Sequence, residues 1–145
     1  TIVKLQLAGS AMDLPAIAVP ETFKATASNV YQNNSADYGP QCAFDDDDQT
    51  RWATDNDVKQ AWLAMDFLKP RTVNHVHISE AYPSRVKKIS FQYRAGNDWK
   101  NIFTGTTLGD DFQKSFATVT AQEFRLNILE TTNGPTITDI KLESK

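Results

Sequence analysis

Hydrophobic and polar residues alternate in short runs along most of the chain, and turn residues separate the runs. A period of two places successive side chains on opposite faces of a β-strand. In the two clearest runs, Lys88–Arg94 and Glu123–Glu130, the apolar side chains share one face and the polar side chains share the other. This pattern predicts antiparallel sheets that pack one face on a core. Similar runs are Ala61–Phe67, Val73–Ser79, Trp99–Thr104 and Thr136–Glu143.

Helical periodicity is missing from the sequence. No window of about a dozen residues repeats apolar positions at i, i+3, i+4 and i+7, so the crossover helices of a parallel sheet or a catalytic barrel are not expected. Turn signals stand at residues 95–98 (Ala-Gly-Asn-Asp) and 133–135 (Asn-Gly-Pro), each between two predicted strands. We therefore expect one all-β domain.

The first twenty residues differ from the rest. Residues 2–7 alternate like a strand, and Gly9 to Pro20 contains small residues and two prolines. This order predicts the tail of a preceding β-domain and a linker over residues 1–20, followed by a β-sandwich module over residues 21–145. The alternative is that residues 2–7 form an edge strand of the same sandwich.

Composition limits the expected partners. The 145 residues include 15 basic and 18 acidic ones, with a net charge of −3 and a pI of about 5.3, so no basic surface for nucleic acid or an anionic membrane is predicted. No apolar run approaches the roughly 18 residues of a membrane-spanning helix. Cys42 is the only cysteine, which excludes an intrachain disulfide and a cysteine-based zinc site.

Four consecutive aspartates, Asp45–Asp48, lie between Phe44 and Trp52. A bare acidic run is ordinarily a solvated loop. Here apolar residues on both sides hold the run close to the core, so its carboxylates cannot move apart freely. A Ca²⁺ ion, which binds roughly six to eight oxygen ligands, would relieve their repulsion. The run lacks the glycine and glutamate of an EF-hand loop, so a calcium site would be of another type.

The segment Ala43–Trp52 resembles the signature A-[IFV]-D-G-[DN]-x-x-T-x-W of discoidin domains, also called coagulation factor 5/8 type C domains, which include family 32 carbohydrate-binding modules. Gln60–Phe67 and Glu123–Leu126 are similar to two strands of that family, and the resemblance extends over about Phe23 to Glu143. The family has glycine where this chain has Asp46, a less comfortable residue in a left-handed turn. The resemblance implies an antiparallel β-sandwich of the jelly-roll type.

A narrower resemblance concerns the copies of this domain that are attached to α-L-fucosidases of glycoside hydrolase family 29. It is carried by Ile78–Tyr82, Asn127–Glu130 and Gly134–Ile137, while Val3–Leu7 resembles the end of the preceding β-domain in those enzymes. The cysteines that bracket vertebrate members are missing, as in the bacterial branch. The resemblance implies a non-catalytic carbohydrate-binding or accessory module of an α-L-fucosidase-like glycosidase, extracellular or periplasmic.

The resemblance also implies a structural calcium ion that joins the acidic loop to a strand about 90 positions later, a closure that would stabilise the fold. The implied ligands are the carbonyls of Cys42, Asp47 and Thr138, the carboxylates of Asp45 and Asp139, and both the carbonyl and the hydroxyl of Thr50.

Sugar binding needs an apolar surface against the C–H face of the ring and polar groups for its hydroxyls. Discoidin modules bind ligands through loops at one end of the sandwich, and the matching loops here offer Tyr31, Asp55, Glu80, Tyr82 and Arg85, with Tyr38 in the same loop as Tyr31. Galactose-binding relatives commonly have histidine where this chain has Ala53, so galactose is not favoured. The expected partners are terminal sugars of glycans and the catalytic domain of the parent chain.

Three other functions stay open. A spacer or docking domain would bind no sugar. An adhesion module for a protein or a lipid head group predicts exposed apolar loop residues, whereas these loops are mainly polar. A hydrolase using Asp55 and Glu80 would need two facing carboxylates, but the chain has no barrel pattern or nucleophile motif. Cys42 and the tryptophans Trp52, Trp62 and Trp99 are predicted to be buried framework residues.

Overall fold

Antiparallel strands make up most of the computed structural model, which describes residues 23–145. They are β1 (Lys24–Ala27), β2 (Trp52–Ala53), β3 (Ala61–Glu80), β4 (Val86–Ala95), β5 (Asp98–Gly105), β6 (Phe112–Thr131) and β7 (Thr136–Glu143). The loop between β1 and β2 contains the short helical turns η2 (Tyr31–Asn33), α1 (Ser35–Tyr38) and η3 (Pro40–Ala43). No helix in this part of the chain is long and apolar enough to cross a membrane. The predicted strand at residues 2–7 and the boundary near residue 20 lie outside the described residues.

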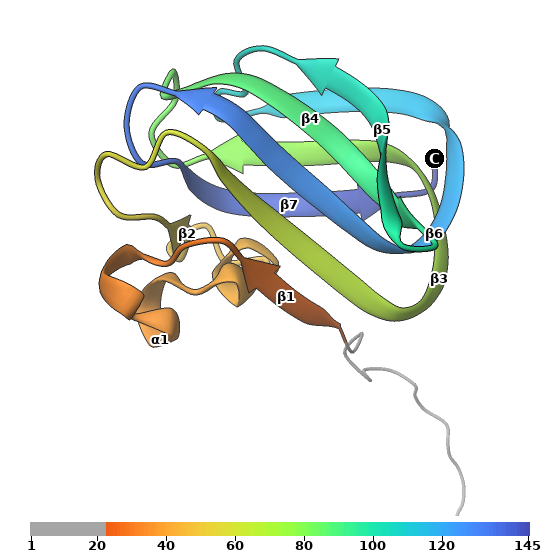
Figure 1. The fold of residues 1–145 in the computed structure, drawn as a ribbon, viewed down its shortest axis with the longest axis horizontal. Helices are drawn as coiled ribbons and strands as arrows, with labels where there is room; N and C mark the ends of the chain where they lie inside the picture. The colour runs from red at the N-terminus through yellow and green to blue at the C-terminus, as the bar shows by residue number, and fades with distance from the viewer. Residues whose placement is uncertain (1–22) are drawn as a thin grey trace, which may run out of the picture.

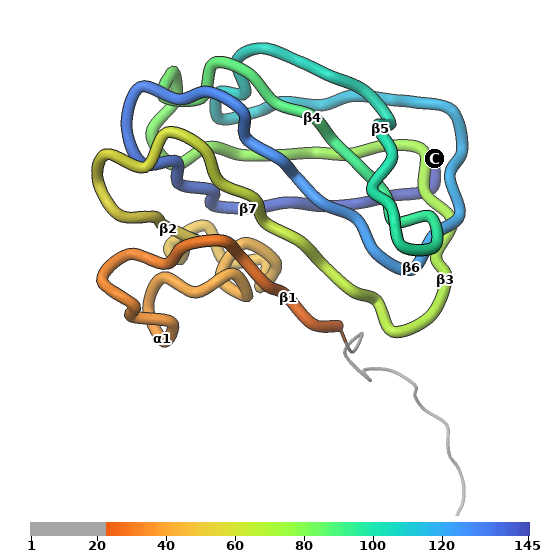
Figure 2. The backbone as a smooth tube through the Cα atoms, in the orientation of Figure 1, coloured from red at the N-terminus to blue at the C-terminus, as the bar shows by residue number. Residues whose placement is uncertain are grey.

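The long strands β3 and β6 run through both layers of the sandwich, as the turn of the backbone in Figures 1 and 2 shows. Residues 61–66 of β3 pair with residues 123–128 of β6, and residues 63–66 also pair with β1. Residues 75–80 of β3 pair with β7, and residues 75–78 also pair with residues 112–115 of β6. The register shifts between Asp66 and Arg71, where Leu68 has a φ of 65°. Strands β4 and β5 complete the first layer, and β2 lies at the edge of β7 in the second.

The six predicted runs all lie in strands, and the main differences concern the lengths of β3 and β6. The runs Ala61–Phe67 and Val73–Ser79 belong to one strand, β3, because the bend between them keeps the pairing with β6. The first half of β6, from Phe112 to Ala121, was not predicted. Most of its side chains are exposed or half-buried, so apolar residues do not alternate there.

The core lies between the two layers, and β4 and β6 build its first side. Ile89 stands opposite Ile128, and Phe91 stands opposite Leu126. All four side chains are fully buried, and the ring of Phe91 stacks on that of Phe124 with centroids 6.3 Å apart. The single apolar face predicted for these two strands is confirmed, and its cross-strand pairs stabilise the layer.

The tryptophans differ in burial. Trp52 is fully buried, and its Nε1 donates a hydrogen bond of 2.9 Å to the carbonyl of Asn29. Trp62 and Trp99 are only half-buried. The guanidinium of Arg125 lies 4.4 Å from the centroid of the Trp99 ring. The predicted core position is therefore confirmed for Trp52, while the other two tryptophans cover strands near the surface.

Leu126→Ala should lower the free energy of unfolding by about 2 to 5 kcal/mol, because it leaves a cavity in a close-packed core. The same truncation at Leu68, which is 43% exposed, should change it by only about 0.5 kcal/mol. Urea denaturation followed by tryptophan fluorescence measures both values. Equal losses would contradict the packing described for Leu126.

Candidate functional site

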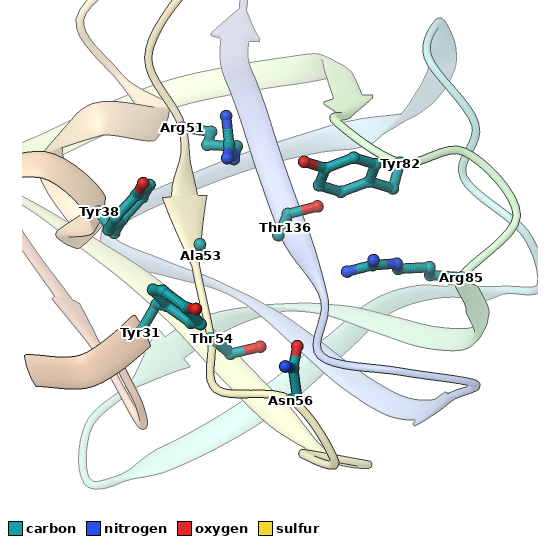
Figure 3. A pocket seen from close by; sticks show the side chains of 9 residues that line it. All are labelled: Tyr31, Tyr38, Arg51, Ala53, Thr54, Asn56, Tyr82, Arg85 and Thr136. Atoms are coloured by element: carbon teal, nitrogen blue, oxygen red, sulfur yellow. The ribbon is translucent and has the colours of Figure 1, made fainter.

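Loops at one end of the sandwich surround a shallow pocket with a volume of about 200 Å³. Figure 3 shows that its walls come from three parts of the chain: the turns η2 and α1, the segment around β2, and the loop between β3 and β4 together with the start of β7. The lining residues are Tyr31, Tyr38, Arg51, Ala53, Thr54, Asn56, Tyr82, Arg85 and Thr136.

Aromatic rings and guanidinium groups alternate along the pocket. The rings of Tyr31 and Tyr38 meet edge to face, with centroids 5.4 Å apart. The guanidinium carbon of Arg51 lies 5.4 Å from the ring centroid of Tyr38 and 5.6 Å from that of Tyr82. The guanidinium carbon of Arg85 lies 4.3 Å from the ring centroid of Tyr82. Cation–π attraction orders Tyr38, Arg51, Tyr82 and Arg85 across the pocket, and the edge-to-face contact with Tyr38 adds Tyr31 to this row.

Two polar atoms of the pocket lack hydrogen-bond partners among the described residues. They are the hydroxyl of Thr136, a residue only 4% exposed, and the Nε of Arg51. Most buried polar groups in proteins are hydrogen-bonded, so an unpaired group points to a partner from outside the chain. Both atoms belong to side chains that line the pocket, and a ligand or water in the pocket can therefore satisfy them.

Asp55 holds the tyrosine wall of the pocket in place. Its carboxylate accepts hydrogen bonds from the backbone N–H of Gln32, at 2.7 Å, and from the side-chain amide of Asn29, at 3.1 Å. These bonds hold the pKa of the Asp55 carboxyl below its usual range. Asp55 is predicted to contact sugar, but it is not a lining residue of the pocket. Its carboxylate instead fixes the turn that carries Tyr31.

Glu80 has the same role on the opposite wall. It is only 2% exposed, and its Oε1 accepts hydrogen bonds from the backbone N–H groups of Arg85 and Val86, at 3.1 and 2.9 Å. Its Oε2 accepts from the N–H of Gly109. The prediction that Glu80 contacts sugar does not fit this position, because both oxygens are engaged away from the pocket. The carboxylate shapes the loop that presents Tyr82.

Gly134 joins the two walls. A Cβ atom at this position would collide with the backbone oxygen of Asp55 and with the Thr54 hydroxyl, so only glycine fits. Its carbonyl accepts a 2.9 Å hydrogen bond from Nη1 of Arg85. The close packing of Gly134 against Asp55 and Thr54 therefore places the carbonyl that orients the Arg85 side chain.

Three of the five predicted sugar-binding residues line the pocket: Tyr31, Tyr82 and Arg85. Arg51 was not predicted, because it stands at an unspecified position of the discoidin signature, between Thr50 and Trp52. A signal was available, because Arg51 precedes the buried Trp52 and so faces away from the core. The other lining residues not predicted as contacts are Tyr38, Ala53, Thr54, Asn56 and Thr136.

Oxygen atoms converge in the acidic loop. The hydroxyl of Thr50 lies 2.6 Å from a carboxylate oxygen of Asp45, 3.0 Å from the carbonyl of Asp47 and 3.3 Å from the carbonyl of Cys42. A hydroxyl has one proton and cannot donate to three acceptors at once. Four of the six predicted calcium ligands thus lie together, and their oxygen-only chemistry suits a hard cation.

Strand β7 reaches the same loop through Lys141. Its Nζ lies 2.8 Å from Oδ1 of Asp46 and 3.6 Å from Oδ2 of Asp139. Burial raises the pKa of the Asp139 carboxyl. Thr138, the sixth predicted ligand, precedes Asp139 on this strand. Asp46 has a φ of 58°, the left-handed conformation expected where the family has glycine.

Side-chain ligands alone would not form the calcium site. Within residues 23–145, no three His, Cys, Asp or Glu side chains are grouped to hold a metal. The carbonyl and hydroxyl oxygens of the loop would therefore have to contribute. Cys42 is buried as predicted, and burial raises the pKa of its thiol, which keeps it protonated and weakly nucleophilic.

Comparison with known proteins identifies the fold. A sequence model of the F5/8 type C domain matches residues 24–141. A GH29 fucosidase from Ruminococcus gnavus in complex with fucose is similar, with a TM-score of 0.77, 25% identity, and coverage of 87% of this chain and 26% of that chain. A putative alpha-L-fucosidase from Bacteroides thetaiotaomicron gives a TM-score of 0.78, 23% identity, and coverage of 85% and 28%.

A separate binding module has the same fold over most of its length. Chitosan-binding module 1 of a chitosanase/glucanase from Paenibacillus sp. IK-5 gives a TM-score of 0.73 and 24% identity, with coverage of 82% of this chain and 92% of that chain. Among curated proteins, no sequence matches significantly. The chain spans about a quarter of the length of the two fucosidases, and the predicted discoidin-like β-sandwich is confirmed.

Glu80→Gln should lower the free energy of unfolding by about 2 to 3 kcal/mol. The substitution replaces one carboxylate oxygen by an NH₂ group, so at least one buried backbone N–H loses its acceptor and faces another donor. Glu130→Gln, at an exposed position of β6, should change it by only about 0.5 kcal/mol. Guanidinium denaturation provides the comparison. If Glu80→Gln proved as mild as its control, the carboxylate would not be holding the loop.

Proposed function

The chain belongs to the F5/8 type C domain family, and on this basis we propose that it is a non-catalytic carbohydrate-binding module whose ligand site is the tyrosine and arginine pocket. The observation that carries the proposal is the buried Thr136 hydroxyl, which lines the pocket without a partner among the described residues. A hydroxyl of a bound sugar would satisfy it.

The chemistry of the pocket suits one end of a glycan. Tyr82 is 45% exposed and offers an aromatic face to the C–H face of a sugar ring. Asn56 and Thr136 provide donors and acceptors for hydroxyl groups. The volume lies below the roughly 300 Å³ of small drug-binding pockets, so we expect contact with a terminal sugar and a Kd of about 10⁻⁴ M, or 5 to 6 kcal/mol.

The competing functions fit the structure less well. A hydrolytic pair of Asp55 and Glu80 would need free carboxylates, and both side chains accept hydrogen bonds from backbone N–H groups. An adhesive membrane module would need exposed apolar loop residues, but Leu68, the only exposed large aliphatic side chain among residues 23–145, lies in the bend of β3. A spacer without sugar binding would leave the unpaired polar atoms of the pocket without a role.

The two fucosidase structures support a place beside a catalytic domain. We propose that the parent protein is an extracellular or periplasmic glycosidase of the α-L-fucosidase type, in which this module helps to hold the enzyme on glycans. The proposal rests on the similarity of the fold and on the share of the fucosidases that the chain covers, about a quarter.

We also propose that the acidic loop binds a structural Ca²⁺ ion. The convergence of the Thr50 hydroxyl with Asp45, Asp47 and Cys42 supports the site. The carboxylate of Asp139 would reach it from β7, where Lys141 already bridges the strand to the loop. When bound, the ion would replace repulsion among these oxygens by attraction and join the first loops to the last strand.

Calcium added to the metal-free protein should raise the melting temperature by several degrees, since an ion at 100 times its Kd contributes about 2.7 kcal/mol. Asp45→Asn should remove this shift. Asp48→Asn should retain it, because the Asp48 carboxylate contacts only the neighbouring Gln49. Differential scanning calorimetry with calcium and with a chelator measures the shifts. Identical melting curves in the two buffers would refute the metal site.

Thr136→Val should weaken glycan binding at least about tenfold and leave the melting temperature unchanged or higher, because it removes an unpaired polar atom from a buried position. Thr131→Val is the matched control for stability. The Thr131 hydroxyl lies 2.9 Å from the carbonyl of Arg85 and 2.7 Å from that of Asn133 and can donate its proton to either, so this variant should melt at a lower temperature. Binding is read on a glycan array with the module clustered on beads. No binding to any glycan would favour the spacer function.

A further inference from the structure

The lining of the pocket carries positive charge. Of its nine residues, Arg51 and Arg85 are basic, and none is acidic. The chain as a whole has a net charge of −3, so this is a local excess and not a general property of the surface. A local excess of one sign inside a concave site selects ligands of the other sign.

Within residues 23–145, neither guanidinium forms a salt bridge with a carboxylate. The salt bridges of this part of the chain involve other cations, such as Arg94 with Glu123 and Lys141 with Asp46. Arg51 has an unpaired Nε, and Arg85 uses Nη1 for the carbonyl of Gly134. Because a guanidinium has five N–H donors, both arginines keep donors for a ligand.

Asp55 and Glu80, two acids of the surrounding loops, are hydrogen-bonded to groups other than the two guanidiniums. The carboxylate of Asp55 is turned to Gln32 and Asn29, and that of Glu80 is buried against backbone N–H groups. Both guanidinium carbons lie within 5.6 Å of the ring centroid of Tyr82, so two like charges stand close together. Their mutual repulsion would be relieved by an anion between them.

We infer that the sugar recognised at this pocket carries a negative charge, either a carboxylate, as in a uronic acid, or a sulfate ester. The inference rests on the proposed sugar-binding function and adds the class of ligand. The planar fork of a guanidinium donates two parallel hydrogen bonds to the oxygens of a carboxylate or sulfate. The ring of the sugar would lie against Tyr82, with one hydroxyl near Thr136.

The test compares sugars that have the same ring and differ at C6, where a carboxylate or a sulfate ester introduces negative charge. The 145-residue chain is titrated with D-galactose, D-galacturonic acid and D-galactose 6-sulfate, and in parallel with D-glucose and D-glucuronic acid, by NMR chemical-shift mapping. At least one charged sugar should bind about tenfold more tightly than its neutral counterpart, and the preference should shrink as salt is raised. The charged sugar that binds distinguishes carboxylate from sulfate recognition.

Variants assign the preference to the pocket. Arg51→Gln and Arg85→Gln should each remove most of the preference for the charged sugar. Arg94→Gln, which removes the same charge near the β4–β5 turn, should keep it. Arg51→Lys retains the charge without the fork and should lose only part of the preference. Melting temperatures of all variants show whether each still folds.

The outcomes separate this inference from the proposed function. Equal or weaker binding of the charged sugars, with the neutral ones bound at the pocket, would overturn the inference and leave the carbohydrate-binding function standing. Charged-sugar binding that survives in both Arg51→Gln and Arg85→Gln would also overturn it. If no sugar binds in these titrations or on the glycan array, both the inference and the proposed carbohydrate-binding function are refuted.

Discussion

The position of the pocket depends on the hydrogen bonds of Asn29. Its carbonyl accepts from the indole of Trp52, and its side chain accepts from the backbone of Asp55 and donates to the Asp55 carboxylate. Trp52 is buried in the core, so these hydrogen bonds fix the position of the loop between β1 and β2 relative to the sandwich. The same carboxylate then holds the N–H of Gln32, and with it Tyr31. Helical turns as short as those of this loop are not stable by themselves, so tertiary bonds of this kind must place them.

The sequence predicts the framework better than the site, for a physical reason. The alternation of apolar and polar residues in Lys88–Arg94 reflects the burial of one face of the sheet. Each strand shows this pattern in its own sequence, so it can be predicted locally. The direction in which a carboxylate points cannot be predicted in this way, because it depends on N–H groups that are distant in the sequence. Glu80 accepts from Gly109, 29 residues away, and Asp55 from Asn29, 26 residues away. For this reason the sequence alone leads to the prediction that both acids contact a sugar. In the structure, they instead shape the two walls of the pocket that the tyrosines and arginines line.

The acidic loop and the pocket are joined by one peptide bond. Thr50, whose hydroxyl meets three oxygens of the loop, is followed by Arg51, whose guanidinium stands between Tyr38 and Tyr82. The family resemblance points to the four loop ligands and to Asp139 because the signature has a fixed spacing. The same resemblance gives no role to Arg51, since residues that contact sugars vary within one fold. A residue that holds the loop, Thr50, and a residue that can select the ligand, Arg51, are thus neighbours in one short segment.

We conclude that the pocket is formed before any ligand binds, with Asp55 and Glu80 as its internal supports. Hydrogen exchange at the backbone N–H of Gln32 in the free protein tests this most directly. Gln32 is an exposed residue, so protection of its amide depends on the bond to Asp55 and not on burial. Exchange at this amide should be slow in the free protein and fast in Asp55→Ala. Fast exchange in the unaltered protein would contradict it and would mean that this wall of the pocket forms only when a ligand is bound.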